Sequence, residues 1–319
     1  MLARTADNLF WLSRYMERAD YLARIVNVAR RLQSMPAAYG GERNEWESAL
    51  TSAGAMEGFA EAYDKADART AIEFLVYDTQ NPSSIVNCIE YARTNARAVR
   101  TALTVETWET INSGWLEVKR IQTSRGDRAD VDSSQLSQLL ELVSKISLDA
   151  DGSAYRTMLR NDAYWFSRLG LFLERADNTA RILDVKYNIL LPETEAIGGS
   201  LDYFQWTAIL RAVSALTSYH WVYRESVKPW LIADLLILRP EMPRSLIACY
   251  GEIARFLDAI GRAYGRQGPS QRHARSVLTR LENSSIKDVF STGLHEFITE
   301  CIEDNGRLGM NIAEQYLVS

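Results

Sequence analysis

A charged decapeptide occurs twice in the chain. In the first copy, YMERADYLAR, the residues Glu17, Asp20 and Arg24 are spaced i, i+3 and i+7, which places them on one face of an α-helix. The second copy, FLERADNTAR, repeats this spacing at positions 174, 177 and 181. We call residues 15–24 and 172–181 the charged motifs. Their candidate binding residues are Glu17, Arg18, Asp20, Arg24, Glu174, Arg175, Asp177 and Arg181.

The charged motifs could do two kinds of chemistry. Guanidinium groups bind carboxylates or phosphates with two parallel hydrogen bonds, while acids can position an amine or a metal ion. In the functional alternative, the two motif helices therefore enclose a polar pocket that binds a substrate or a partner. In the structural alternative, the same groups pair with one another and hold the two helices in register.

The arginine after each glutamate is predicted at the edge of its helix's apolar face. Arg18 falls between Trp11 and Ile25 on a helical wheel, and Arg175 falls beside Ile182. An arginine in this place must extend to solvent or meet an acid. In the structural alternative, that acid is a carboxylate on the helix of the other motif.

The similarity between the two copies continues beyond the charged motifs. The helix positions match at an offset of 157 residues, YGGERNEW matches IGGSLDYFQW, and FLVYDTQNPSSIVNC matches LLILRPEMPRSLIAC. Chance similarity between helices would not repeat the turn residues as well. We predict an internal duplication into helical repeats at 1–151 and 152–319, packed as one compact unit with pseudo-twofold symmetry. The motif neighbours Arg14 and Tyr21, which differ between the copies, are predicted to be exposed.

Helical periodicity dominates the chain and predicts an all-α, multi-helix bundle. No series of short alternating runs bounded by turn residues indicates a sheet. The first helix is predicted from about Thr5 to Ser34, with one apolar face and with Ser13 and Asp20 on the opposite, polar face. Breaks rich in Pro, Gly, Ser and Asp separate about twelve candidate helices, and one of these breaks is DADGS at 149–153.

The amino-acid composition excludes several classes of protein. The 319 residues are 47% apolar and 24% charged, as in a globular chain. The net charge of −5 gives no general attraction to nucleic acids or anionic membranes. The three cysteines lack CxxC spacing, and no uninterrupted apolar run marks a secretory signal, so we expect a cytoplasmic protein. The most apolar run, WLIADLLIL, is too short to cross a bilayer.

Common catalytic motifs are missing from the sequence. The three histidines form neither HExxH nor the ExxH of di-iron bundles, so no metal site is predicted. Neither GxxxxGK[ST] nor GxGxxG provides a phosphate-binding loop, so we expect no nucleotide cofactor on this chain. Cys88 and Cys249 match each other within apolar helices and are predicted to be core residues rather than nucleophiles.

Four stretches, in order, resemble the bacterial Alpha-E family, which is named for its helical content and its Glu-Arg motif. They are LFWLSRYMERADYLARIVNV, ARTNARAVRTALTVETWETIN, LGLFLERADNTARILDVKYNIL and YRESVKPWLIADLLILRPEMPRSL, and the resemblance covers essentially the whole chain. Besides the two Glu-Arg pairs, the recurrent stretches contain Asn95, Arg97, Arg100 and Arg244. Taken alone, the arginines near Asn95 could form an anion-binding surface, although a solvated helix face explains them more simply.

The resemblance implies a role beside another protein. Members of the family occur next to, or fused to, circularly permuted ATP-grasp proteins of the carboxylate-amine ligase type, often near transglutaminase-like peptidases. This implies an ATP-grasp partner that carries ATP and magnesium, and a small peptide or amino-acid substrate. Arg18 and Arg175 would then hold an anionic group or an internal carboxylate, and the two glutamates would accept the substrate amine or pair with those arginines.

Two further alternatives remain open from the sequence. The chain could itself be an enzyme that uses clustered carboxylates as general acid and base or as magnesium ligands, which requires a carboxylate with a raised pKa or a bound ion. It could also be a scaffold without a small-molecule site, in which case its buried polar groups should all be paired with one another.

Overall fold

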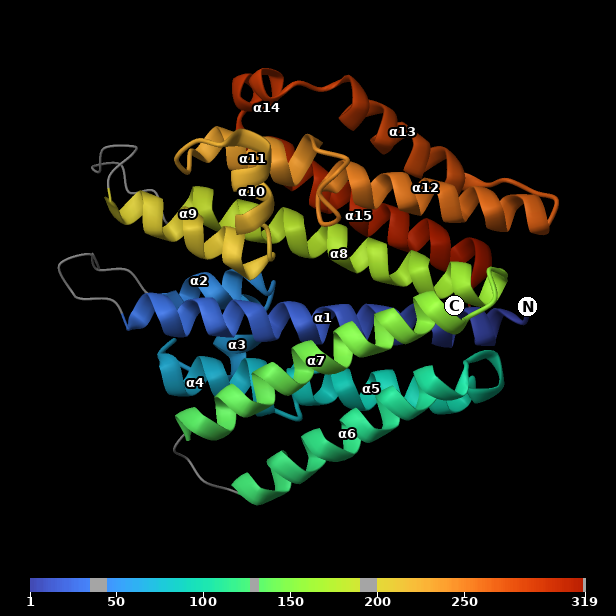
Figure 1. The fold of residues 1–319 in the computed structure, drawn as a ribbon, viewed down its shortest axis with the longest axis horizontal. Helices are drawn as coiled ribbons and strands as arrows, with labels where there is room; N and C mark the ends of the chain where they lie inside the picture. Colours follow the sequence, from blue (N-terminus) through green and yellow to red (C-terminus); the bar gives the residue numbers. More distant parts are fainter. Residues whose placement is uncertain (35–44, 127–131, 190–199, 318–319) are drawn as a thin grey trace.

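The computed structural model describes residues 1–34, 45–126, 132–189 and 200–317, and these ranges contain fifteen α-helices and no strand (Figure 1). The all-α prediction is therefore confirmed. The helices before residue 160 are α1 (Ala3–Gln33), α2 (Glu45–Ser52), α3 (Met56–Ala62), α4 (Ala68–Ile72), α5 (Ile85–Ala98), α6 (Val105–Arg125) and α7 (Ser133–Thr157). The later helices are α8 (Asp162–Ile189), α9 (Ser200–Ala212), α10 (Leu216–Tyr223), α11 (Pro229–Leu238), α12 (Leu246–Ala263), α13 (Pro269–Asn283), α14 (Ile286–Thr292) and α15 (Leu294–Tyr316).

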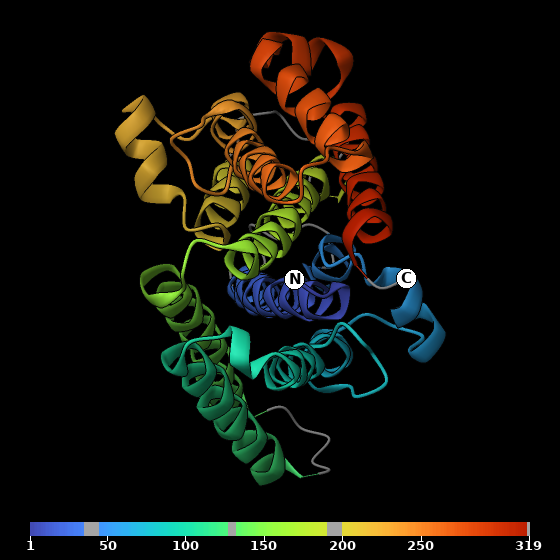
Figure 2. The same ribbon diagram turned by 90° about the vertical axis from the view of Figure 1, so that its right-hand side faces the viewer.

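Two long helices, α1 and α8, form the centre of the fold. They pack against each other, while α5 and α7 also pack on α1, and α12 and α15 also pack on α8. Figures 1 and 2 show α5, α6 and α7 on one side of the central pair and α11 to α15 on the other. The two helices that carry the charged motifs are thus the most enclosed elements of the described chain.

The predicted polar face of the first helix is wrong. Ser13 and Asp20, which a helical wheel assigns to that face, are only 6% and 2% exposed. The predicted ends, Thr5 and Ser34, lie within two residues of the observed ones. A wheel assumes one covered face, whereas α1 is covered by α8 as well as by α5 and α7. Its buried polar groups must therefore find partners inside the protein.

The predicted break at 149–153 is also wrong, because α7 continues through it from Ser133 to Thr157. A single glycine in a helix costs only about 1 kcal/mol relative to alanine, and tertiary packing overrides this cost readily. Here Ala150 and Ala154 are buried on either side of Gly152.

The matched loops before α5 and α12 begin their helices in the same way. The hydroxyl of Ser84 accepts a hydrogen bond from the Asn87 amide at 3.4 Å, and that of Ser245 accepts one from the Ala248 amide at 3.2 Å. Each serine is the N-cap of its helix, a position that serine favours. The matched glycines of YGGERNEW and IGGSLDYFQW lie outside the described residues.

The two matched cysteines lie in the protein core, as predicted. Cys88 and Cys249 are both completely buried, and burial raises the pKa of each thiol to about 12. None of the helices in the described ranges combines the length and the apolar character needed to cross a bilayer.

Candidate functional site

The close approach of α1 and α8 brings the two charged motifs together. The two helices run in the same direction (Figure 1). The hydroxyl oxygens of Ser13 and Ser167 lie 2.7 Å apart in the interface. A Cβ atom on Gly170 would lie 2.1 Å from the carbonyl oxygen of Phe10, so only glycine permits this approach. The side chains one and two turns further along can then reach the opposite helix.

Glu174 on α8 is buried and binds two arginines of α1. Arg18 donates from Nε to Oε1 at 2.6 Å and from a terminal nitrogen to Oε2 at 3.2 Å. Arg14 donates from Nε to Oε2 at 2.7 Å, and its guanidinium lies 4.7 Å from the ring centre of Trp11. Both carboxylate oxygens of Glu174 are therefore occupied by charged donors.

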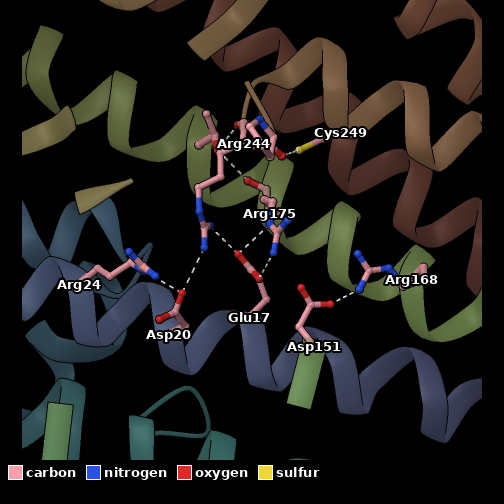
Figure 3. Close-up of polar contacts among 10 residues, drawn as sticks. Glu17, Asp20, Arg24, Asp151, Arg168, Arg175, Arg244 and Cys249 are labelled. Carbon is pink, nitrogen blue, oxygen red and sulfur yellow. Dashed lines mark hydrogen bonds and ion pairs between the residues drawn. The ribbon is translucent and has the colours of Figure 1, made fainter. Parts of the chain in front are cut away.

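Glu17 on α1 binds two arginines from the other part of the chain (Figure 3). Arg175 of α8 donates from Nε to Oε1 at 3.1 Å and from a terminal nitrogen to Oε2 at 2.9 Å. Arg244, in the loop before α12, donates to Oε1 at 2.6 Å. The arginine after each glutamate thus pairs with the glutamate of the other helix. This is the pairing that the structural alternative predicts.

The aspartate and the last arginine of each charged motif pair within their own helix. Arg24 donates from Nε to Asp20 Oδ2 at 2.7 Å, and Arg181 donates from Nε to Asp177 Oδ2 at 2.6 Å. Asp20 additionally accepts a hydrogen bond of 3.2 Å from Arg244. These contacts define one group of residues around Glu17. Asp177 and Arg181 line a cavity together with Arg18 and Glu174, and these residues form a second group with Arg14. The Glu17 cluster contains Glu17, Asp20, Arg24, Arg175 and Arg244, and the Glu174 cluster contains Arg14, Arg18, Glu174, Asp177 and Arg181.

The electrostatics of the two glutamates favour the ionised form. Burial by itself raises the pKa of Glu174, but the two guanidinium groups bound to it outweigh this effect and lower the pKa from the usual 4.5 to about 2. Burial of Glu17 is likewise outweighed by its two arginines, and its pKa lies well below the usual value. Neither glutamate therefore has the raised pKa that a general acid at neutral pH requires.

A cavity of about 180 Å³ lies beside the Glu174 cluster. Its charged wall consists of Arg18, Glu174, Asp177 and Arg181, and the turn 53–55 between α2 and α3 forms part of its rim. Asn178 also lines the cavity and is 5% exposed, yet its amide nitrogen has no hydrogen-bond partner within the described ranges. In the part of the chain that the structure describes, no group of three His, Cys, Asp or Glu side chains is placed to hold a metal ion.

The structure brings together nine of the twelve candidate residues predicted from the sequence. The other three lie elsewhere: Asn95 is half-buried on α5, Arg97 is exposed on the same helix, and Arg100 is exposed in the following 3₁₀ turn. None of these three hydrogen-bonds to either cluster in the described residues. Arg100 instead lies 5.3 Å from the ring centre of Trp108.

Two residues of the site were not identified as candidates. Arg14 was predicted to be exposed because position 171 of the other copy is Leu, yet it binds Glu174. Its i, i+4 spacing from Arg18 is a signal that could have placed both guanidinium groups on one helix face. Tyr21 was also predicted to be exposed, but it is 4% exposed and its hydroxyl lies 2.5 Å from that of Ser52.

A family comparison finds proteins that share the Glu-Arg motif. A family model described as a predicted alpha-helical domain with a conserved ER motif, named Alpha-E, matches residues 1–317. The chain belongs to the Alpha-E family. In this Alpha-E chain, the Glu-Arg dipeptide occurs once on each central helix, and each dipeptide supplies one acid and one base to the contact between them.

Similar proteins occur in Mycobacterium bovis and Mycobacterium tuberculosis, and each carries the description of an uncharacterized protein. Each is 24% identical to this chain over 319 residues, which cover 94% of this chain and 35% of the relative. The chain therefore spans about a third of the length of these curated relatives. No solved structure matches it significantly.

Proposed function

We propose that this Alpha-E chain is a helical subunit, without a nucleotide site of its own, of a cytoplasmic ATP-grasp system that joins a carboxylate to an amine. In this proposal, the ATP-grasp partner binds ATP and magnesium and activates the carboxylate. The Alpha-E chain binds the substrate, a small peptide or an amino acid, or completes the assembly. It needs neither nucleic acid nor a membrane.

One observation supports the part of this proposal in which the Alpha-E chain does not itself catalyse the reaction. Both oxygens of each motif glutamate accept hydrogen bonds from arginines, and the pKa of each glutamate is lowered. A carboxylate in this state is a poor proton donor and has little capacity left for a magnesium ion. The bond-forming chemistry is therefore assigned to a partner. The ATP-grasp identity of that partner comes from the family resemblance, and the greater length of the relatives is compatible with a helical unit that works beside another module.

We also infer that the fold arose by duplication of a helical repeat, with halves at 1–151 and 152–319 that pack as one unit about a pseudo-twofold axis. The reciprocal pairs Arg18–Glu174 and Arg175–Glu17 support this, and so do the equivalent N-caps of α5 and α12. The inferred boundary lies inside α7, which would then connect the halves.

A scaffold without a ligand site is the second candidate, and the Glu17 cluster favours it. Glu17 is saturated by two arginines, and Arg24 donates to Ser214 Oγ at 2.6 Å as well as to Asp20. The Glu174 cluster does not fit a scaffold as well, because it borders a cavity of about 180 Å³. A buried polar atom without a partner in the described chain occurs at both clusters: Asp20 Oδ1 at one, and the amide nitrogen of Asn178 at the other.

Coexpression with an ATP-grasp protein encoded by the same organism tests the proposed function. We expect the two proteins to copurify, and the complex to form an amide product with ATP hydrolysis that the Alpha-E chain alone does not show. Arg97→Glu reverses an exposed charge on α5 and should weaken the association, whereas Arg120→Glu, on the exposed side of α6, is the matched control. Failure of the wild-type proteins to associate would refute the proposal.

A further inference from the structure

We propose that the cavity beside the Glu174 cluster binds a small α-amino acid. Arg181 holds its carboxylate, and Asp177 holds its ammonium group. This inference deepens the proposed function, on which its biological meaning rests. The structural evidence for it is the difference between the two clusters in the described residues.

At the Glu17 cluster, the arginine and one oxygen of the aspartate are bound by side chains from elsewhere in the chain, while Asp20 Oδ1 is buried without a partner in the described ranges. The turn 213–215 between α9 and α10 places Ser214 in the left-handed region at φ 56°, and its hydroxyl accepts a hydrogen bond of 2.6 Å from Arg24. The loop before α12 supplies Arg244, which donates to Asp20 Oδ2 at 3.2 Å. Two side chains from outside the central helices therefore bind this motif, and Figure 3 shows one of them, Arg244.

Both of these side chains are absent at the Glu174 cluster. The turn 53–55 has the same backbone bonds as the turn 213–215 and the same left-handed residue, but that residue is Gly54, at φ 63°. The position in the loop before α5 that matches Arg244 is Ser83. The cavity of about 180 Å³ is lined by both of these small residues.

The loss of these two side chains leaves polar groups without protein partners. In the described ranges, the side chains of Arg181 and Asp177 form a hydrogen bond only with each other, from Nε to Oδ2 at 2.6 Å. The terminal guanidinium nitrogens of Arg181 thus remain available, whereas Arg24 donates from one of its own to Ser214. Asp177 Oδ1 is also available, and its counterpart Asp20 Oδ1 lacks a partner within the described residues as well. The amide nitrogen of Asn178, in the same wall, is buried and also has no partner in the described chain. Buried donors of this kind are rare unless a water or a ligand pairs with them.

The charges of the Glu174 cluster and the volume of the cavity indicate which ligand could bind. The Glu174 cluster contains three guanidinium groups and two carboxylates, and the excess positive charge attracts an anion. A planar carboxylate matches the fork of terminal nitrogens on Arg181, while the free oxygen of Asp177 requires a cation or another donor nearby. An α-amino acid presents both groups a few ångströms apart. The volume corresponds to roughly six waters in the liquid, which is room for a ligand of about six to nine non-hydrogen atoms.

The cavity also has an apolar wall and an entrance. Tyr21, Leu22 and Leu75 also line it and would contact a short side chain. Gly54 is exposed and the side chain of Arg181 is 32% exposed, so the charged end opens to solvent. A small apolar or polar side chain therefore fits the interior, with the zwitterionic end held at the mouth.

Isothermal titration calorimetry of the isolated Alpha-E chain tests this site without an ATP-grasp partner. The probes are glycine, L-alanine, L-serine and L-aspartate, with acetate and ethylammonium as the separate halves of a zwitterion. We expect at least one of the four amino acids to bind saturably, and more tightly than either acetate or ethylammonium. The assay needs no second protein, so its failure is distinguishable from failure of the proposed partnership.

Two variants transfer the side chains of the Glu17 cluster to the cavity. Ser83→Arg introduces the residue found at 244, and Gly54→Ser introduces the residue found at 214 in a backbone conformation that Ser214 already adopts. Each should weaken the binding of the amino acid by about tenfold or more, because each competes for Asp177 or Arg181. Circular dichroism and the melting temperature establish that each variant is folded. If the Ser83→Arg variant does not fold, the affinity of the Gly54→Ser variant alone tests the position of the site.

Several results would overturn the proposal. One is the absence of saturable binding for all four amino acids to the folded wild-type chain. Another is unchanged affinity in the folded variants, which would place the ligand elsewhere. Acetate binding as tightly as the amino acids would remove the role assigned to Asp177.

Discussion

Replacing Glu174 with Gln tests whether the Glu-Arg motif stabilises the contact between the central helices. The side chain of Glu174 is 3% exposed, and its charge is balanced by Arg14 and Arg18. Glutamine has almost the same shape but no charge, so the variant leaves two partly buried guanidinium groups beside a neutral amide. We expect α1 and α8 to lose much of the free energy that holds them together.

The size of this effect follows from the pKa of Glu174. A decrease from 4.5 to about 2 corresponds to roughly 3 kcal/mol of stabilisation by the ionised form. Removing one partner of a buried ion pair costs about 3 to 5 kcal/mol in other proteins, which agrees with this value. Because the pKa is lowered in the folded state, the stabilisation is fully present above pH 4.5 and is lost as the pH falls to about 2.

Urea unfolding, followed by far-UV circular dichroism, measures the effect at neutral pH and at several steps down to about pH 3. The difference in unfolding free energy between wild type and Glu174→Gln should be about 3 kcal/mol at neutral pH and should shrink steadily below pH 4.5. Glu117→Gln is the matched control, because Glu117 forms an exposed ion pair with Arg120 on α6. A difference that stays constant with pH, or an equal effect of Glu117→Gln, would contradict the reasoning.

Three further changes test separate parts of the interface. Gly170→Ala should lower the unfolding free energy by roughly 3 kcal/mol or more, measured by urea unfolding, because its Cβ would lie 2.1 Å from the Phe10 carbonyl oxygen. Arg14→Leu should destabilise the chain less than Glu174→Gln in the same assay, because Arg18 still neutralises the glutamate. The three cysteine thiols, whose pKa burial raises to about 12, should resist iodoacetamide at neutral pH until urea unfolds the chain, as mass spectrometry can establish.

The all-α class and one ion pair of the site could be predicted from the sequence, because both follow from the pattern of residues along single helices. Helical periodicity recurs over every described range and predicts the all-α class. The pairing of Arg18 with Glu174 could also be anticipated, since an arginine at the edge of an apolar helix face needs an acid from the element that covers it. A second motif helix with the same pattern is the natural source of that acid.

The burial of α1 could not be predicted in the same way. A helical wheel records the order of side chains around one helix but not how many neighbours cover it. Asp20 is therefore on the polar side of the wheel and yet 2% exposed, because its surroundings come from the loop that carries Arg244. That loop is more than two hundred residues away in the sequence. Only the tertiary packing of α12 against α8 brings it to α1.

The two clusters contain the same number of acids and arginines, but a cavity of about 180 Å³ lies beside the Glu174 cluster. Each motif glutamate binds two arginines, but the second comes from a different place: Arg14 on α1 in one cluster, and Arg244 in a loop in the other. The positions that match Arg14 and Arg244 in the sequence are Leu171 and Ser83, so each arginine corresponds to an apolar or small residue at the other cluster. Charge balance is kept at both glutamates, since a buried carboxylate without a counter-ion is costly. The arginine that comes from the loop also binds the aspartate of its cluster, whereas Arg14 does not. A pair of charged motifs can therefore keep its ion pairs and still have a cavity beside one of the two motifs.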